Sequence, residues 1–152
     1  MTSAYESLIS DLKIKLKNKN IKFQMLFKLI NNQNYDKIIE IIDDKTIHTL
    51  VENIVTERER IGNNMENKLN DLLWLNKQLI QYGEEPQVSK TKALKLLKKK
   101  VFINIYDSEA EKYERRTTKQ LLKKELREKA ERRFPLWIAK KHITLRSFLI
   151  SM

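Results

Sequence analysis

Glycine and proline are scarce in this chain, which has two of each among its 152 residues. Sheet proteins use both residues in hairpins and tight turns, and nucleotide-binding loops need glycine. The scarcity therefore argues against sandwiches, barrels and Gly-rich phosphate loops. Because aliphatic residues are scattered through many lysines, we expect amphipathic helices with wide solvated faces. The predicted fold is all-α, a small helical bundle of one domain or of one modest core with an extended arm.

The chain has no cysteine, which excludes disulfides, thiolate metal sites and cysteine nucleophiles. No run of about 18 apolar residues occurs, so no segment is expected to span a bilayer. The N-terminal residues, with Glu6 and Asp11, do not resemble a signal or transit peptide. We expect no membrane contact, no cofactor and a nuclear location, with a cytoplasmic location as the alternative.

Three short helices are expected in residues 1–45, an N-terminal helical cluster. Ser3 and Glu6 have capping-box spacing, and apolar residues recur at helical intervals behind them. A second predicted helix is apolar on nearly every side and must be covered by neighbours. A third, isoleucine-rich helix follows, and Asp43 and Asp44 are expected to end it.

Residues 46–82 carry the longest helical pattern, with apolar residues spaced by four and three. One long central coiled-coil-like helix is one interpretation. A bend at 62–64, where Gly and two Asn are poor helix formers, would give a helix pair instead. The predicted partner-binding residues are the apolar positions of this seam: Ile47, Val51, Ile54, Ile61, Met65, Leu72, Leu75 and Leu79.

An exposed seam would require a covering helix from a second copy or from another protein subunit, so a homodimer and a hetero-oligomer are both possible. Arg58 and Lys68 lie on the seam and would favour acidic residues on that partner. In the alternative, residues 21–42 and the C-terminal tail cover the seam from within the chain. The pattern of apolar residues leaves both arrangements open.

Positive charge is concentrated after residue 87. Of the 31 Lys and Arg, 19 lie beyond this point, against 7 of the 20 Asp and Glu. Residues 83–89 are the clearest linker, and 90–152 are predicted to form a basic helical region with an apolar C-terminal tail. A polyanion is therefore the first partner to consider for the C-terminal half.

Two helices are expected to carry these cations. Ser89 should cap the first, a lysine-rich helix. Ser108 and Glu111 have capping-box spacing, which predicts a second helix from Ser108 to about Arg133. Between them, residues 101–106 resemble a strand, which would need another chain to pair with, and we favour the alternative that they are the buried end of the first helix.

The second predicted helix has Lys and Arg at i+4 spacing, with Arg132 and Arg133 close by, which suits contact with successive phosphates. A solvated face partly neutralised by glutamates is the alternative. Most aromatic residues in this region lie among apolar residues in the sequence, which favours contact with the nucleic-acid backbone over base stacking. The predicted nucleic-acid-binding residues are Lys95, Lys98, Lys99, Lys100, Arg115, Arg116, Lys119, Lys123, Lys124 and Arg127.

No motif indicates catalysis. His48 and His142 lack neighbours at metal-ligand spacing, and no nucleotide-binding or nucleophile motif occurs. We therefore expect a non-catalytic helical subunit of a nuclear multiprotein assembly that links protein partners to DNA or chromatin through its basic C-terminal surface. A protein–protein adaptor without nucleic-acid binding and an RNA-associated ribonucleoprotein factor are the alternatives.

Overall fold

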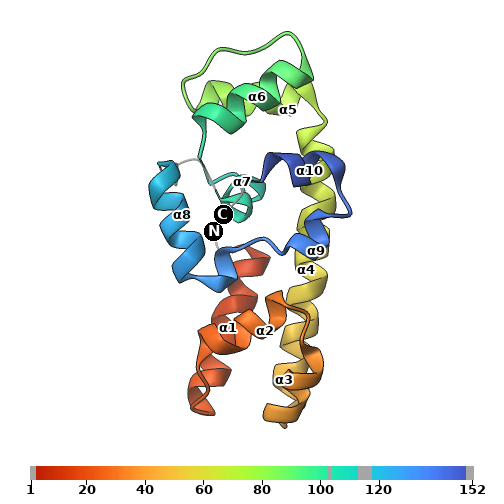
Figure 1. The fold of residues 1–152 in the computed structure, drawn as a ribbon, viewed down its shortest axis with the longest axis vertical. Helices are drawn as coiled ribbons and strands as arrows, with labels where there is room; N and C mark the ends of the chain where they lie inside the picture. The colour runs from red at the N-terminus through yellow and green to blue at the C-terminus, as the bar shows by residue number, and fades with distance from the viewer. Residues whose placement is uncertain (1–2, 103, 113–117, 150–152) are drawn as a thin grey trace.

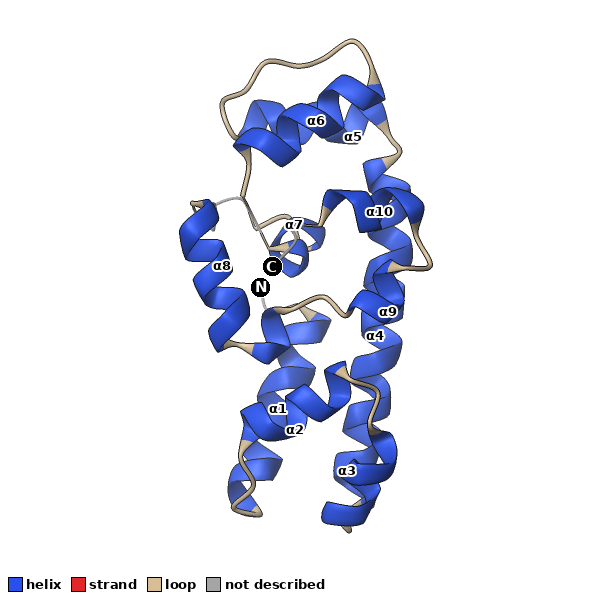
Figure 2. Cartoon of the chain, viewed as in Figure 1, coloured by secondary structure: helices blue, strands red, loops and turns tan. Residues whose placement is uncertain are grey.

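The computed structural model describes residues 3–102, 104–112 and 118–149. The elements in these residues are helices (Figures 1 and 2), which confirms the all-α prediction. They are α1 (Ala4–Asn18), α2 (Phe23–Asn31), α3 (Tyr35–Ile41), α4 (Lys45–Leu69), α5 (Leu72–Gln81), α6 (Lys90–Lys100), α7 (Ile105–Glu109), α8 (Lys119–Glu128), the 3-10 helix η2 (Ala130–Arg132), α9 (Leu136–Ala139) and α10 (Ile143–Phe148).

The three N-terminal helices form as predicted, and local polar residues define where helices begin. The Ser3 hydroxyl accepts a hydrogen bond from the Glu6 N–H at the start of α1. The Asp44 carboxylate accepts from the N–H groups of Thr46 and Ile47 at the start of α4. The apolar α2 is covered by its neighbours, as its composition requires. A side-chain acceptor at these positions satisfies N–H groups that the helix itself leaves unpaired.

Residues 46–82 form a helix pair, but the predicted bend at Gly62 is wrong. α4 continues through Gly62, and the chain turns at Asn70 and Asp71. Asp71 caps α5 by accepting from the Leu73 N–H at 3.0 Å. A Cβ atom at Gly62 would lie only 3.0 Å from Ile138 Cγ2, so glycine lets the segment containing α9 approach α4 closely. Gly62 therefore serves packing rather than helix termination.

The apolar seam of α4 and α5 is buried within the chain. α1 packs along α4, and α9 and α10 cover another part of the same helix. The chain thus covers its own seam, as in the internal alternative, with the C-terminal tail in its predicted place but with α1, rather than residues 21–42, forming the main contact with α4. The predicted partner-binding residues Ile47, Val51, Ile54, Ile61, Met65, Leu75 and Leu79 are buried and Leu72 is partly buried in this core.

The region after the linker agrees with its prediction in α6 and differs from it in the segments that follow. Ser89 caps α6 as expected, and α6 packs against α5. In residues 101–106, Ile103 lies outside the described residues, and the described residues of this segment form no strand. Within the segment, Val101 is the buried C-cap of α6, as expected, whereas Asn104 caps a separate α7 that already ends at Glu109. The predicted continuous helix from Ser108 to Arg133 is therefore wrong. Glu111 has a φ of +58°, which no continuing α-helix adopts.

The apolar tail docks on the body of the molecule, as its composition predicted. α9 and α10 pack against α4 (Figure 1), and Leu145 is fully buried. The Glu66 carboxylate of α4 accepts hydrogen bonds from the N–H groups of Leu145 (2.7 Å) and Thr144 (3.1 Å) in the first turn of α10. A side chain from a distant part of the sequence thus caps this short helix. No helix among the residues described above is long and apolar enough for a membrane crossing.

Candidate nucleic-acid interface

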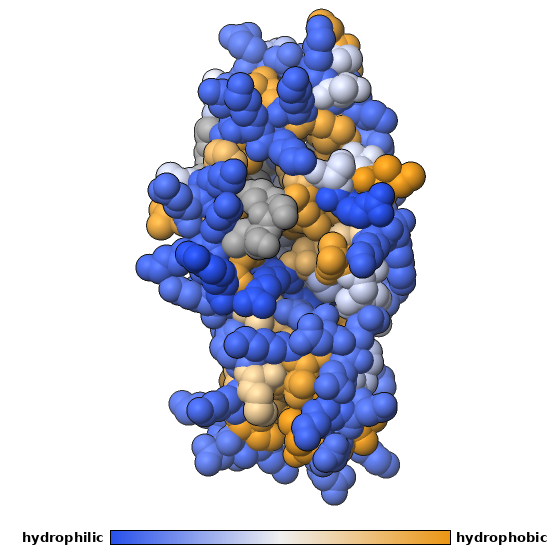
Figure 3. Space-filling view, viewed as in Figure 1, coloured by the Kyte–Doolittle hydropathy of each residue, from blue (hydrophilic) through white to orange (hydrophobic). Residues whose placement is uncertain are grey.

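The structure places eight of the ten predicted cations on two separate helices, α6 and α8. Seven of them are solvent-exposed and Lys123 is partly exposed. Hydrophilic side chains cover much of the face of the molecule shown in Figure 3. Arg115 and Arg116 lie outside the described residues. We call the eight described side chains the basic surface: Lys95, Lys98, Lys99 and Lys100 on α6, and Lys119, Lys123, Lys124 and Arg127 on α8.

The orientation of α8 follows from its amphipathic sequence. Thr118 caps the helix by accepting from the Leu121 N–H, and Leu122 is buried on the inner face. Lys119, Lys123 and Arg127 follow one another at i+4 and therefore share one side of the helix. The row predicted from the sequence is thus present within α8, although it is shorter than the predicted helix would have allowed.

Four carboxylates of the C-terminal half form ion pairs outside the basic surface. Asp107 and Glu125 pair with Arg132, Glu109 pairs with Arg60, and Glu131 pairs with Lys13. Among the described residues, no carboxylate forms an ion pair with seven members of the basic surface, which are Lys95, Lys98, Lys99, Lys119, Lys123, Lys124 and Arg127. These four acidic residues thus connect parts of the fold, and most of the basic surface has no ion pair with a described carboxylate.

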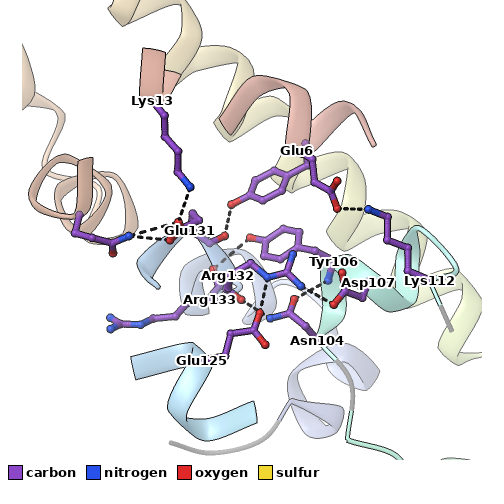
Figure 4. A network of polar contacts seen from close by, with 12 residues as sticks. Glu6, Lys13, Asn104, Tyr106, Asp107, Lys112, Glu125, Glu131, Arg132 and Arg133 are labelled. Carbon is purple, nitrogen blue, oxygen red and sulfur yellow. Dashed lines mark hydrogen bonds and ion pairs between the residues drawn. The ribbon is translucent and has the colours of Figure 1, made fainter. Parts of the chain in front are cut away.

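Arg132, expected beside the basic row, is instead part of an internal polar network (Figure 4). Its guanidinium lies 2.5 Å from Asp107 Oδ2 and 2.6 Å from Glu125 Oε1. The Asn104 side-chain amide donates to the Arg132 carbonyl at 2.8 Å, and the Tyr5 hydroxyl donates to the Glu131 carbonyl. These contacts hold η2 against α1, α7 and α8. Arg132 is therefore unavailable as an exposed phosphate contact.

Arg58, which the sequence placed on a seam facing an acidic partner, is 1 % exposed inside the chain. It donates to Asn31 Oδ1 at 2.6 Å and to the Arg133 carbonyl at 2.9 Å. Its guanidinium carbon lies 4.7 Å from the centre of the Phe27 ring and 5.7 Å from that of Tyr5. No ion pair joins it to a described carboxylate, so neutral acceptors and aromatic faces hold this charge.

Two stacked tyrosines complete the surroundings of this arginine. The rings of Tyr5 and Tyr106 are 4.1 Å apart and nearly parallel, and the Tyr106 hydroxyl donates to the Arg133 carbonyl at 3.2 Å. Burial raises the pKa of both tyrosines, although the nearby Arg58 opposes this effect. Both hydroxyls therefore remain protonated at neutral pH. Neither can act there as an anionic partner for the arginine.

A cavity of about 540 Å³ lies beside the basic surface. Lys98 of α6 and Arg127 of α8 line it, so it connects the two basic helices. Phe134 and Phe148 also line it, and both are partly buried. The sequence separated aromatic residues from cations, whereas the tertiary structure brings these two groups to one cavity.

Among the residues that the structure describes, no three His, Cys, Asp or Glu side chains are grouped so that they could hold a metal ion. His48 Nε2 lies 2.7 Å from the Ile42 carbonyl oxygen, and the His142 ring packs near Gly62. These contacts give both histidines a place in the fold. The prediction that the chain is not an enzyme stays a prediction.

No family model, no curated protein and no solved structure shows a significant match to this chain. A function is therefore inferred from the residues and their geometry.

Proposed function

We propose that this chain is a non-catalytic helical protein that binds the phosphate backbone of nucleic acid through the basic surface of α6 and α8. The supporting observation is that four acidic residues of the C-terminal half pair with Arg132, Arg60 and Lys13, whereas seven cations of the basic surface form no ion pair with a carboxylate among the described residues. The wider role predicted from the sequence, linking protein partners to DNA or chromatin within a nuclear assembly, belongs to the same proposal.

Such binding would be driven by the release of counterions from nucleic acid. Each cation that neutralises a phosphate adds to the salt dependence of the affinity, with a slope of about 0.9 per contact for duplex DNA. Lysine and arginine contacts to phosphates carry little sequence information. We therefore expect binding that depends strongly on salt and weakly on base sequence.

The test reverses the charge of the i+4 row on α8. The triple variant carries Lys119→Glu, Lys123→Glu and Arg127→Glu. Its affinity for a short DNA duplex should be about tenfold lower or weaker still, and that affinity should depend less on salt concentration. Fluorescence anisotropy at several salt concentrations measures both. The matched control reverses Lys15, Lys17 and Lys28, which are exposed on α1 and α2 and change the net charge equally.

Binding that persists in the α8 variant, or that weakens equally in the control, would contradict the assignment of the basic surface. Competition separates this proposal from a protein–protein adaptor that holds its partner by apolar contacts. Heparin should displace a labelled duplex but should not displace a partner held by apolar contacts. A comparison of duplex DNA, single strands and structured RNA distinguishes DNA binding from the ribonucleoprotein alternative.

A further inference from the structure

The cavity between α8, α10 and residues 132–136 combines apolar walls with a cationic edge. Its volume of about 540 Å³ lies within the range of small-molecule sites, about 300–1,000 Å³. Its apolar walls come from α6, α7, α8 and the C-terminal tail. The apolar lining residues are Val101, Ile105, Leu122, Leu126, Phe134, Pro135, Leu136, Phe148 and Leu149.

Four cationic residues line the same cavity, of which Arg132 is paired with Asp107 and Glu125, and carbonyl groups hold two of the other three in place. The Lys98 ammonium donates to the Ser147 carbonyl at the end of α10. The Arg133 guanidinium donates to the carbonyls of Leu126 and Arg127 in the last turn of α8. Neutral carbonyls position a cation without cancelling its charge. No ion pair joins Lys98, Arg127 or Arg133 to a carboxylate in the described part of the chain.

We propose that this cavity binds an amphipathic anion, a molecule with a single aliphatic chain and a carboxylate or phosphate head. The aliphatic chain of the ligand would lie against Leu122, Leu126 and Phe148. Removal of its apolar surface from water would stabilise the complex. The head would lie at the edge between Lys98, Arg127 and Arg133, which supply charge-assisted hydrogen bonds. This site goes beyond nucleic-acid binding and does not depend on it, although Lys98 and Arg127 would serve both.

Titration calorimetry of the full chain tests the ligand chemistry. Decanoate and decyl phosphate, used below their micelle concentrations, represent the two head groups. Acetate and inorganic phosphate supply the heads alone, and 1-decanol supplies the chain without charge. We expect saturable binding of one molecule of decanoate, decyl phosphate or both, and at least tenfold weaker binding of the head groups and of decanol. If neither decanoate nor decyl phosphate binds, or if decanol binds as tightly, the proposal is wrong.

Paired variants test the location of the site. Lys98→Gln with Arg127→Gln should weaken decanoate binding at least tenfold. Lys119→Gln with Lys124→Gln removes the same charge from residues that do not line the cavity and should leave decanoate binding unchanged. Equal weakening in both double variants would show adventitious attraction to a basic protein and would overturn the proposal.

Wall variants separate this site from the nucleic-acid interface. Leu126→Asn should weaken decanoate binding while leaving duplex binding unchanged, because it alters the apolar wall and no cation. Leu149→Asn, on another wall, repeats the test if circular dichroism shows that the first variant does not fold. Unchanged decanoate affinity in a folded wall variant would contradict the proposal without bearing on nucleic-acid binding.

Discussion

Arg58 is a buried charge held without a carboxylate in the described structure. Two carbonyl-type acceptors, from Asn31 and Arg133, and three aromatic rings surround its guanidinium. A planar guanidinium can lie between rings and still direct hydrogen bonds within its plane, which a lysine ammonium cannot do. The geometry of the group therefore matters here as much as its charge.

We predict that Arg58→Lys destabilises the fold more than Arg58→Met does. Lysine keeps a buried charge but loses the stacking and one acceptor, and an unpaired buried charge costs about 3–5 kcal/mol. Methionine removes the charge and leaves only the Asn31 side-chain oxygen without its donor, which costs about 1–3 kcal/mol, because the Arg133 carbonyl still accepts from the Tyr106 hydroxyl. Urea unfolding of both variants measures the order. A lysine variant as stable as the original chain would show that the aromatic cage contributes little.

At the scale of single elements, Gly62 fixes how closely the tail approaches α4. An added Cβ would lie 3.0 Å from Ile138 Cγ2 and 3.2 Å from Phe134 Cζ. We predict that Gly62→Leu lowers the free energy of unfolding by about 1–3 kcal/mol, because overpacking outweighs the gain in helix propensity. Asn63→Leu, an exposed neighbour, is the control and should be neutral or stabilising in thermal unfolding. If both substitutions stabilise, the contact between α4 and the tail is not tight.

Glu66 joins two elements by capping α10 from α4. Partial burial opposes its ionisation, but the N–H groups of Leu145 and Thr144 lower the pKa of Glu66 below its ordinary value of 4.5. The folded state therefore binds this proton less readily than the unfolded state does. The resulting stabilisation is present above about pH 4.5 and is lost as the pH falls through the lowered pKa.

We predict that Glu66→Gln costs about 1–2 kcal/mol at pH 7, as expected for loss of a helix cap. The difference from the original chain should shrink as the pH falls below about 4.5, because the carboxylate of the original chain is then protonated. Urea unfolding between pH 7 and pH 3 tests this. Glu52→Gln, exposed on the same helix, should show no such change. A constant difference at all pH values would exclude the carboxylate as its cause.

The elements that the sequence predicted well are those with local signals. The hydroxyls of Ser3 and Ser89 accept hydrogen bonds from N–H groups three residues further along the chain. A short stretch of sequence is therefore enough to predict these two caps. Ser108 and Glu111 have the same type of spacing as Ser3 and Glu6 and yet begin no helix. There Asn104 starts α7 earlier, and Asp107 contacts Arg132 far along the chain. Capping-box spacing does not predict a helix start where contacts with distant residues stabilise a different local structure.

For the molecule as a whole, burial of the seam predicts a protein that folds alone. α1, α9 and α10 cover the apolar face of α4, so that face needs no second chain. Sedimentation equilibrium should give a mass near 18.2 kDa at all protein concentrations. A mass that rises with concentration would show that another surface associates. A chain that is unfolded at low concentration would contradict internal coverage of the seam.

The sequence alone determined the helical class, the caps at Ser3 and Ser89 and the excess of positive charge after residue 87, because composition and local spacing carry these properties. Only the tertiary structure decided that the chain buries its own seam and that Arg132 pairs internally while α6 and α8 keep exposed cations. It also brought Lys98 and Arg127 to one cavity. Such contacts join residues far apart in the sequence, and periodicity on one helix cannot specify which neighbour covers it.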